Sequence, residues 1–405
     1  MNFGDQSLKE NGRPGSSSAS IDWVARATRL VPVIEAATDR IELERRVPDD
    51  IMSALHEAEL FRMCLPPWLG GGETTPKVVF RVTEIIASAD ASTGWCLGQA
   101  LGCSRMSGFL DRAVAHEVFG SPDAVLAWGP PEGIAKSVVV DGGYRVTGKW
   151  RLASGMRNAN WLGPICTVCD SDGTPRQDAD GNPVLRTMLL PISSATLIDV
   201  WNVLGLRGTG SDSFAIDDLF VPEAYTFHRD SPLDRREDGP LYRMGLSNFY
   251  AVAFAGVALG VARSAIKDFI KLAADKKPYH SSMVLRDNPA VQRHVAEAEA
   301  SLGSARSYLL EMLDAAWDSG HPADAWPLDH RARFRLACVN AVVQSRSVVE
   351  FSYQAAGSTA IFQNNPFERR LRDINTVAQQ AQGQPVNFEH VGSALMGQEI
   401  KGGRV

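Results

Sequence analysis

The side chains of greatest intrinsic reactivity in this sequence are six cysteines: Cys64, Cys96, Cys103, Cys166, Cys169 and Cys338. Cys166 and Cys169 stand at the spacing of a zinc-binding pair, but no second pair and no spaced histidines follow them. Both also lie in or beside the apolar run of residues 162–168, which is typical of a buried strand. The sequence therefore predicts no metal site here.

A group of acidic residues follows this run at positions 170, 172, 178 and 180. Their spacing is not that of a twelve-residue calcium loop, and the closing glutamate of such a loop is missing. We interpret the segment as a polar hairpin turn.

The common signatures of catalysis are missing from the sequence. There is no GxSxG, no GxxxxGK[ST] and no HExxH, and the eight histidines are scattered. If the chain is an enzyme, a bound organic cofactor is then expected to carry the difficult chemistry.

Composition narrows the class of protein. The chain has 405 residues, with 41 Lys and Arg against 47 Asp and Glu, a net charge of −6. This balance argues against nucleic-acid binding, which needs a basic face. The apolar run 249–262 is too short to span a bilayer, and the first residues lack the apolar core of a signal peptide. We expect two or three domains in a cytoplasmic protein, with no membrane partner.

Patterning along the chain divides it into four segments. Residues 1–20 are too polar to fold alone and are expected to be disordered. Residues 21–122 carry helical periodicity and form a predicted N-terminal helical domain.

Residues 123–230 read as a middle domain of short strands. Residues 137–140 and 144–146 flank the turn Asp141-Gly142-Gly143, and further strands are expected at 161–169, 186–191, 196–200 and 213–221. With turns and no helices between them, these strands predict an antiparallel sheet that is closed into a barrel or sandwiched.

Residues 231–405 return to helix. Apolar residues recur on one face of 259–273, and between Val291 and Met312 they recur at alternating spacings of four and three. The fold predicted from pattern alone is mainly α with a central β domain and a C-terminal helical bundle.

Five motifs in this order resemble the acyl-CoA dehydrogenase superfamily, over about residues 25–400. They are Val47-Pro48-Asp49 through Leu69-Gly70-Gly71; Tyr144 to Trp150 with Ala153-Ser154-Gly155; Leu204 to Thr209; Gly260-Val261-Ala262-Arg263; and Tyr353 to Ser358 followed by Arg372-Asp373. The resemblance implies an N-terminal helical domain, a middle antiparallel β-barrel or sandwich and a C-terminal four-helix bundle.

Two chemistries occur in that superfamily. Acyl-CoA dehydrogenases carry a catalytic glutamate soon after the Arg-Asp pair, but here no carboxylate follows Asp373 until Glu389. Removal of an α-proton needs a base within reach. The segments Asp90 to Trp95 and 388–397 instead resemble the oxygenase components of two-component flavin-dependent monooxygenases. These use reduced flavin and O2, through a C4a-hydroperoxyflavin, to hydroxylate or epoxidise aromatic substrates.

This resemblance implies roles for particular residues. Ser154 is expected to hold the flavin N5 region, and Gln380 and Asn375 stand where relatives place catalytic polar groups. Flavin contacts are expected from Trp128, Gly129, Ser154, Gly155, Gly357, Ser358 and Thr359, and substrate contacts from Trp95, Cys103 and Ser104. Structural alternatives stay open: a strand-end serine at 154, a core tryptophan at 128 and a plain helix cap at 357–359.

The sequence departs from the family at two histidines. Where many relatives have them, this chain has the stretch Gly102-Cys103-Ser104-Arg105 and, after Asp373, Asn375 and Gln380. Glutamine cannot transfer a proton at neutral pH. An electron-rich substrate such as an indole needs no deprotonation, so a phenol is the less favoured substrate.

The resemblance also implies partners. With no GxGxxG fingerprint, reduced flavin (FADH2 or FMNH2) is expected from a separate NAD(P)H:flavin reductase. The helical seam and the family point to a homotetramer. The alternatives are an acyl-CoA dehydrogenase-like flavin dehydrogenase or oxidase, and a non-catalytic relative that acts in binding or assembly.

Overall fold

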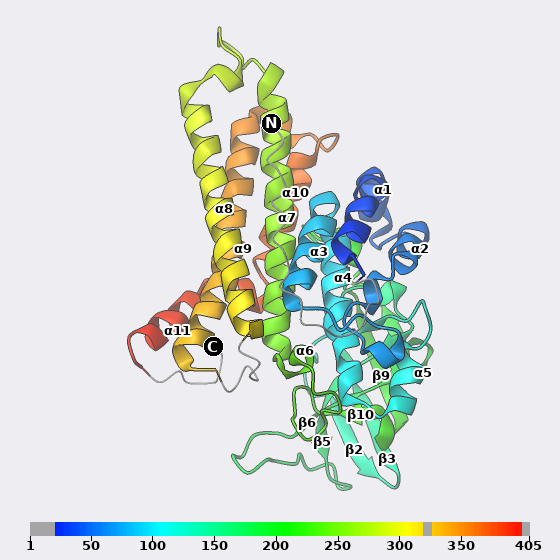
Figure 1. Ribbon diagram of the computed structural model, residues 1–405. Helices are drawn as coiled ribbons and strands as arrows, with labels where there is room; N and C mark the ends of the chain where they lie inside the picture. The colour runs from blue at the N-terminus through cyan, green and yellow to red at the C-terminus, as the bar shows by residue number, and fades with distance from the viewer. Residues whose placement is uncertain (1–20, 319–325, 399–405) are drawn as a thin grey trace.

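The computed structural model describes residues 21–318 and 326–398. The predicted disorder of residues 1–20 lies outside the described residues. Along the rest of the chain, helices come first, then strands, then helices (Figure 1).

The first helical group is assembled from amphipathic helices with recognisable caps. Asp22 accepts a hydrogen bond from the Ala25 amide at the start of α1, and Thr75 does the same for Val78 at the start of α3. The helices are α1 (Trp23–Glu44), α2 (Asp49–Glu57), α3 (Pro76–Ala89), α4 (Ala91–Ser104) and α5 (Arg112–Phe119), with short 3₁₀ helices at Leu60–Arg62, Pro67–Leu69 and Arg105–Phe109.

The strands form two sheets. A small sheet has the order β1-β4-β7, and a larger one has the order β10-β6-β5-β2-β3-β9-β8. The strands are β1 (Leu126–Ala127), β2 (Lys136–Val140), β3 (Gly143–Trp150), β4 (Trp161–Leu162), β5 (Ile165–Cys169), β6 (Leu185–Met188), β7 (Leu190–Pro191), β8 (Thr196–Ile198), β9 (Ser213–Pro222) and β10 (Thr226–Phe227).

The predicted antiparallel sheet, closed into a barrel or sandwiched, differs from the structure in three details. β2 pairs with β5, and β1 with β4, in parallel. The larger sheet has two ends and is therefore open. The strands expected at 161–169 and 186–191 are each divided between the two sheets, since the chain turns at Gly163-Pro164 and again at Leu189.

The predicted hairpin turns are confirmed. β2 and β3 pair across Asp141-Gly142, and Gly142 has φ +71°, which favours glycine. In the acidic segment, the Asp172 and Asp178 carboxylates accept hydrogen bonds from nearby backbone amides of their own turns.

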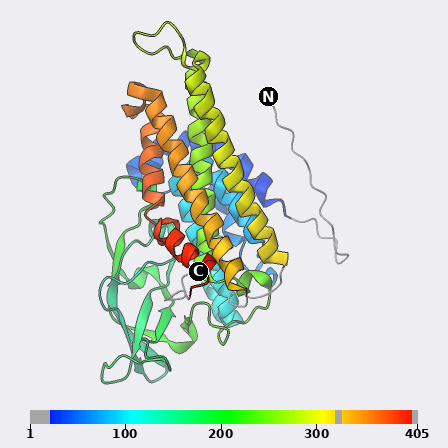
Figure 2. The same ribbon diagram turned by 90° about the vertical axis from the view of Figure 1, so that its left-hand side faces the viewer.

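The C-terminal helices form a bundle around α7 (Leu246–Asp275) that rises above the sheets (Figures 1 and 2). The other helices are α6 (Pro240–Arg243), α8 (Pro289–Asp318), α9 (Leu328–Ala356), α10 (Pro366–Val377) and α11 (Val386–Leu395), with short 3₁₀ helices at Leu285–Asp287, Gly357–Ile361 and Ala381–Gly383. The predicted apolar face of 259–273 is buried, and the seam of α8 is buried from Ala298 onward. The fold is mostly helical with a curled, half-barrel β region at its centre, which confirms the predicted class.

The apolar run 249–262 lies inside a helix longer than the run suggested. By length and composition α7 could cross a membrane, but 94% of its most apolar 18-residue window is buried. It packs against α3, α4, α9 and α10. The apolarity of α7 is therefore that of a core helix.

Candidate functional site

One face of α4 meets α7 through aromatic rings. Asp90 caps α4 by accepting a hydrogen bond from the Thr93 amide (2.7 Å). Trp95, on this face, stacks on Phe254 of α7 with ring centroids 3.9 Å apart and planes 14° apart. Tyr250, one turn before Phe254, stacks on it in turn at 5.4 Å. These three rings form what we call the aromatic wall.

The loop after β3 places Ser154 against this wall. The Trp95 indole N–H donates to the Ser154 hydroxyl (3.0 Å). Gly155 has φ +77° and its amide donates to the Thr209 carbonyl (2.8 Å), which binds the turn to the loop before β9. The Ser154 and Ser211 hydroxyls are 2.7 Å apart. A residue from the β region and a residue from α4 thus meet directly.

The loop before β9 is held by a buried carboxylate. Leu206 has φ +52°, and its amide donates to Asp373 of α10 (2.7 Å). The Thr209 hydroxyl donates back to the Leu206 carbonyl (2.9 Å) and lies 2.7 Å from the Ser211 hydroxyl. The Arg157–Asp212 ion pair closes the same loop.

A cation, Arg229, lies near enough to Tyr250 of the aromatic wall to interact with it electrostatically. The Arg229 guanidinium stacks over Trp128, with its carbon 3.8 Å from the ring centroid. Its N–H groups donate to the Thr187 hydroxyl and the Gly163 carbonyl. Burial lowers the pKa of Arg229, yet a guanidinium keeps its proton at neutral pH.

Gly129, next to Trp128, fits only as glycine. A Cβ there would lie 1.9 Å from the Arg151 carbonyl oxygen. The strand end that carries Trp128 therefore lies directly against the chain leaving β3. Trp128 itself is buried.

Two of the three residues predicted to contact the substrate, Cys103 and Ser104, are buried. Cys103 is fully buried, 3.9 Å from the Tyr250 hydroxyl, and burial raises the pKa of its thiol to about 12. The Ser104 hydroxyl donates to the Leu101 carbonyl of its own helix (3.1 Å). Trp95 alone of the three is partly exposed.

Gln380 and Asn375 lie at the end of α10. The Asn375 amide donates to the Leu371 carbonyl (2.8 Å), and the Gln380 side chain accepts from the Gln382 amide (2.8 Å). Gln382 also reaches Ser247 at the start of α7 (3.3 Å). In the part of the chain that the structure describes, neither Gln380 nor Asn375 hydrogen-bonds Ser154 or its partners Trp95 and Ser211.

Gly357, Ser358 and Thr359 lie elsewhere. They open the 3₁₀ helix after α9, where Lys276 donates to the Ala356 carbonyl and to the Thr359 hydroxyl. Lys276 follows α7, 22 residues after Phe254. At 1.5 Å a residue this separation is about 33 Å along the helix. One chain therefore does not bring these residues to Ser154.

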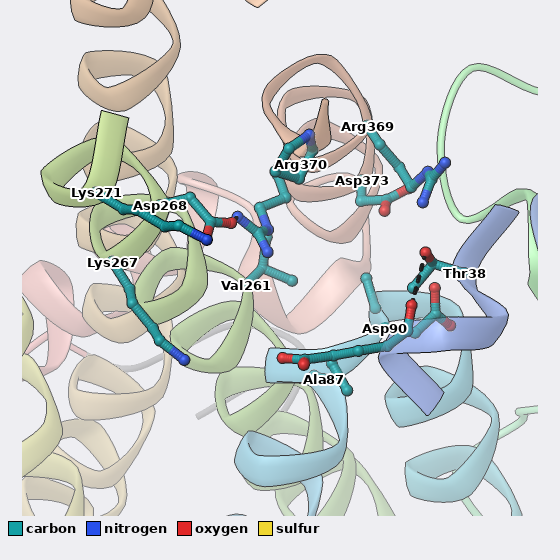
Figure 3. A pocket seen from close by; sticks show the side chains of 14 residues that line it. Thr38, Ala87, Asp90, Val261, Lys267, Asp268, Lys271, Arg369, Arg370 and Asp373 are labelled. Carbon is teal, nitrogen blue, oxygen red and sulfur yellow. Dashed lines mark hydrogen bonds and ion pairs between the residues drawn. The ribbon is translucent and has the colours of Figure 1, made fainter. Parts of the chain in front are cut away.

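Two cavities lie between the helical groups. One, of about 400 Å³, has Lys267 and Lys271 on one side and Asp90 and Asp373 on the other (Figure 3). The other, of about 570 Å³, includes Trp201 in its lining. Neither is lined by Ser154 or by the aromatic wall.

Sequence reasoning missed part of this cluster. Tyr250 and Phe254 lie four residues apart in an apolar run from which the sequence predicted only that it is too short to span a bilayer. Ser211 lies two residues after the Leu204 to Thr209 motif, and Arg229 stands alone among loop residues. Helical spacing could have paired the two rings, but nothing local marks Ser211 or Arg229.

No metal site is present among the described residues: no group of three His, Cys, Asp or Glu side chains could hold an ion. The six cysteines are all free and buried, including Cys166 and Cys169 in β5.

Comparison with known proteins adds to this geometry. Residues 252–385 match the family described as Acyl-CoA dehydrogenase, C-terminal domain. The chain is 28% identical to the indole-3-acetate monooxygenase of Pseudomonas putida, over 94% of this chain and 97% of the relative. It is also 28% identical to the oxygenase subunit HsaA of a flavin-dependent monooxygenase from Rhodococcus jostii, covering 86% of this chain and 91% of that one.

Among solved structures, XiaF from Streptomyces sp., in complex with FADH2 and glycerol, superposes with a TM-score of 0.84 at 26% identity, covering 94% of this chain and 96% of XiaF. Over almost its whole length the chain is similar to the oxygenases of flavin-dependent monooxygenases, and it has an acyl-CoA dehydrogenase-like fold. The family resemblance read from the motifs is confirmed. The roles given to individual residues stay predictions.

The residues of the cluster fit a reduced flavin of such an oxygenase. A reduced isoalloxazine carries an N–H at N5 and an acidic N1. Ser154 offers a hydroxyl and Arg229 a fixed positive charge held over the buried Trp128 ring. Absence of a carboxylate between Asp373 and Glu389 also agrees with an oxygenase rather than a dehydrogenase.

Proposed function

We propose that this chain is the oxygenase of a two-component system and that it hydroxylates or epoxidises a small, electron-rich aromatic such as an indole. The contact between Trp95 and Ser154 carries the proposal, because it joins an aromatic wall for a substrate to the hydroxyl expected beside flavin N5. Reduced flavin, as FADH2 or FMNH2, supplies the electrons that activate O2.

The chain's own residues would hold the flavin on three sides. Ser154 and Gly155 stand at the turn after β3, and Trp128 with Gly129 at the end of β1. The Arg229 cation suits the negative charge that a reduced flavin carries at N1. Since Arg229 already uses two of its N–H groups on Thr187 and Gly163, its orientation is fixed before a ligand arrives.

The aromatic wall would bind a flat substrate and keep water away. Trp95 is partly exposed to the site, and the buried Phe254 and Tyr250 rings stacked behind it give apolar surface in place of a polar one. Exclusion of water limits wasteful release of hydrogen peroxide. This is the function that we assign to the wall.

The site offers no base to a phenol. The thiol of Cys103 has a raised pKa, and burial raises the pKa of the Tyr250 hydroxyl well above its ordinary value. Gln380 and Asn375 carry amides, which orient a polar substrate group but move no proton. A substrate activated by its own ring nitrogen needs no such base, and a related enzyme is named for indole-3-acetate.

A second copy of the chain would complete the flavin site. Residues 357–359 lie about 33 Å from the aromatic wall along α7, farther than one flavin reaches. Their backbone amides and the nearby Lys276 ammonium suit a phosphate. If residues 357–359 bind a flavin, that flavin must have its ring beside Ser154 of another copy of the chain. Such sharing supports the predicted homotetramer.

Delivery of the cofactor requires a partner. We infer a separate NAD(P)H:flavin reductase, because the sequence has no nicotinamide fingerprint and the relatives are oxygenase subunits. We also infer a cytoplasmic location, where the six free cysteines stay reduced.

The test is a product assay with a generic flavin reductase, NADH and ¹⁸O2, offering indole and phenol substrates with FMN and FAD in turn. We expect one ¹⁸O atom in the product of an indole-type substrate. Anaerobic reduction of the bound flavin by an acyl-CoA would instead support a dehydrogenase. No binding of flavin in either redox state would support a non-catalytic relative.

The shared site has its own test. Ser154→Ala and Gly357→Val chains, each impaired alone, are mixed after mild dissociation. Mixed assemblies contain sites with both natural residues, so we expect part of the activity to return. Activity that stays absent in mixtures, with light scattering showing mixed assemblies, would place the two residues in unrelated roles.

A further inference from the structure

The hydroxyls of Ser154, Ser211 and Thr209 form an unbroken row between the aromatic wall and a backbone carbonyl. Ser154 and Ser211 are 2.7 Å apart, and so are Ser211 and Thr209. Thr209 ends the row on the Leu206 carbonyl at 2.9 Å. All three hydroxyls belong to residues that are at most 8% exposed, so water does not compete along the row.

The carbonyl at the end of the row sets the direction of every proton. A carbonyl only accepts, so the single proton of Thr209 goes to Leu206. Ser211 must then donate to Thr209, and Ser154 must donate to Ser211. The reverse order would leave the Thr209–Leu206 contact without a proton and the Ser154 hydroxyl without an acceptor, which buried groups rarely tolerate.

The carbonyl also receives two N–H groups, those of Thr209 (3.1 Å) and the Trp201 indole (3.1 Å). The Thr209 hydroxyl is the closest of its three donors. Every contact in the row has a proton only when Ser154 donates to Ser211, Ser211 to Thr209 and Thr209 to the Leu206 carbonyl.

The other end of the row is equally constrained. The Trp95 indole N–H can only donate, and it occupies one lone pair of Ser154. With its proton committed to Ser211, Ser154 has a single lone pair left. Toward any ligand beside it, Ser154 is an acceptor.

We propose that Thr209 and Ser211 are positioning residues that turn Ser154 into a hydrogen-bond acceptor and so make the site select reduced over oxidised flavin. The inference rests on the proposed function. Reduced flavin carries an N–H at N5, which matches the free lone pair of Ser154. Oxidised flavin has a lone pair at N5, which would face another lone pair.

The row of hydroxyls therefore suits the exchange of flavin between the reductase and the oxygenase. The oxygenase must take reduced flavin from solution and give up oxidised flavin after each turnover. A serine free to rotate would serve both redox states alike, by donating to one and accepting from the other. A serine with its proton committed serves one of them.

The experiment measures the ratio of dissociation constants for oxidised and reduced flavin, with FMN and FAD, by anaerobic titration and by the potential of bound flavin. In Ser211→Ala the proton of Ser154 is released, and in Thr209→Val the proton of Ser211 is released to turn toward Ser154. For both variants we expect tighter binding of oxidised flavin. The ratio of the dissociation constants, oxidised over reduced, should fall by about five- to tenfold, which is the effect of one hydrogen bond. For a two-electron couple this is a fall in potential of about 20–30 mV.

Two controls separate proton direction from packing. Thr209→Ser keeps a hydroxyl and should keep the ratio of the natural protein. Ser352→Ala removes a buried hydroxyl that bonds only the Val348 carbonyl of α9, far along the sequence from the row, and should also keep the ratio.

The outcomes of the test are distinct. An unchanged ratio in Ser211→Ala and Thr209→Val, with flavin still bound, overturns the proposal and leaves the proposed function standing. A fall in Thr209→Ser equal to that in Thr209→Val also overturns it, because packing would then be the cause. Absence of binding by both redox states in the natural protein overturns the proposed function itself.

Discussion

Replacing Asp373 by asparagine should change how the stability of the protein depends on pH. Asp373 is buried and accepts the Leu206 amide that anchors the loop before β9. Burial, with the nearby Asp90 and Glu42 carboxylates, raises the pKa of Asp373 to about 7, against the lowering effects of Leu206 and Arg372. Asparagine keeps an acceptor for the amide without the charge.

The sign and size of the effect follow from linkage. A carboxyl whose pKa is raised by folding stabilises the folded state below its unfolded pKa of 3.8, and that stabilisation is lost as the pH rises through about 7. Between pH 5 and pH 8 the folded natural protein would lose about 2–3 kcal/mol of unfolding free energy through this group. Asp373→Asn should not lose it.

The assay is urea denaturation followed by circular dichroism at fixed protein concentration and at several pH values from 5 to 8. The difference between variant and natural protein cancels most other titrating groups, and it should grow in favour of the variant by about 2–3 kcal/mol as the pH rises. Asp373→Ala is the control. Without an acceptor for the Leu206 amide it should be less stable than Asp373→Asn by about 1–3 kcal/mol throughout. A difference that stays flat, or that grows in the opposite direction, would refute the argument that a charged Asp373 is costly in this site.

Three further predictions concern single side chains. Ser154→Ala should release about 5- to 30-fold more hydrogen peroxide per product formed, the effect of one lost hydrogen bond of about 1–2 kcal/mol, as peroxide and product assays would measure; unchanged coupling would remove Ser154 from the flavin site. Gln380→Ala should raise the KM of a polar aromatic substrate but leave peroxide release without substrate unchanged, and a changed rate in that control would contradict its assignment to the substrate. Arg105→Met should lower the free energy of unfolding by about 3–5 kcal/mol in urea denaturation, because it leaves the Asp230 carboxylate and three backbone carbonyls without their buried partner; a loss below about 1 kcal/mol would contradict this.

Local pattern determined the helices and the fold class. The apolar periodicity of α7 and α8 and the Asp141-Gly142 turn act within a few residues, and each is found where it was expected. Order of motifs along the chain was enough to indicate the family, because family motifs keep their order even where identity is low.

Pairing of strands was decided only in three dimensions. β2 and β5 pair in parallel although about 25 residues separate them, and no turn residue between them encodes this. The run 161–169 has one continuous apolar character, but Gly163 and Pro164 divide it between two sheets, since proline donates no ladder hydrogen bond.

The candidate site shows most clearly which features the local sequence predicts and which depend on the tertiary structure. Ser154 could be named from its motif, but its environment comes from Trp95 and Ser211, 59 and 57 residues away in the sequence. Conversely, Gly357 carries a motif as clear as that of Ser154, yet the length of α7 keeps it from the aromatic wall in one chain. The sequence by itself determined which side chains are available for chemistry. The tertiary structure decided which of them meet and, through the Leu206 carbonyl, which way their protons point, because a hydroxyl's direction depends on the partner at the far end of its row.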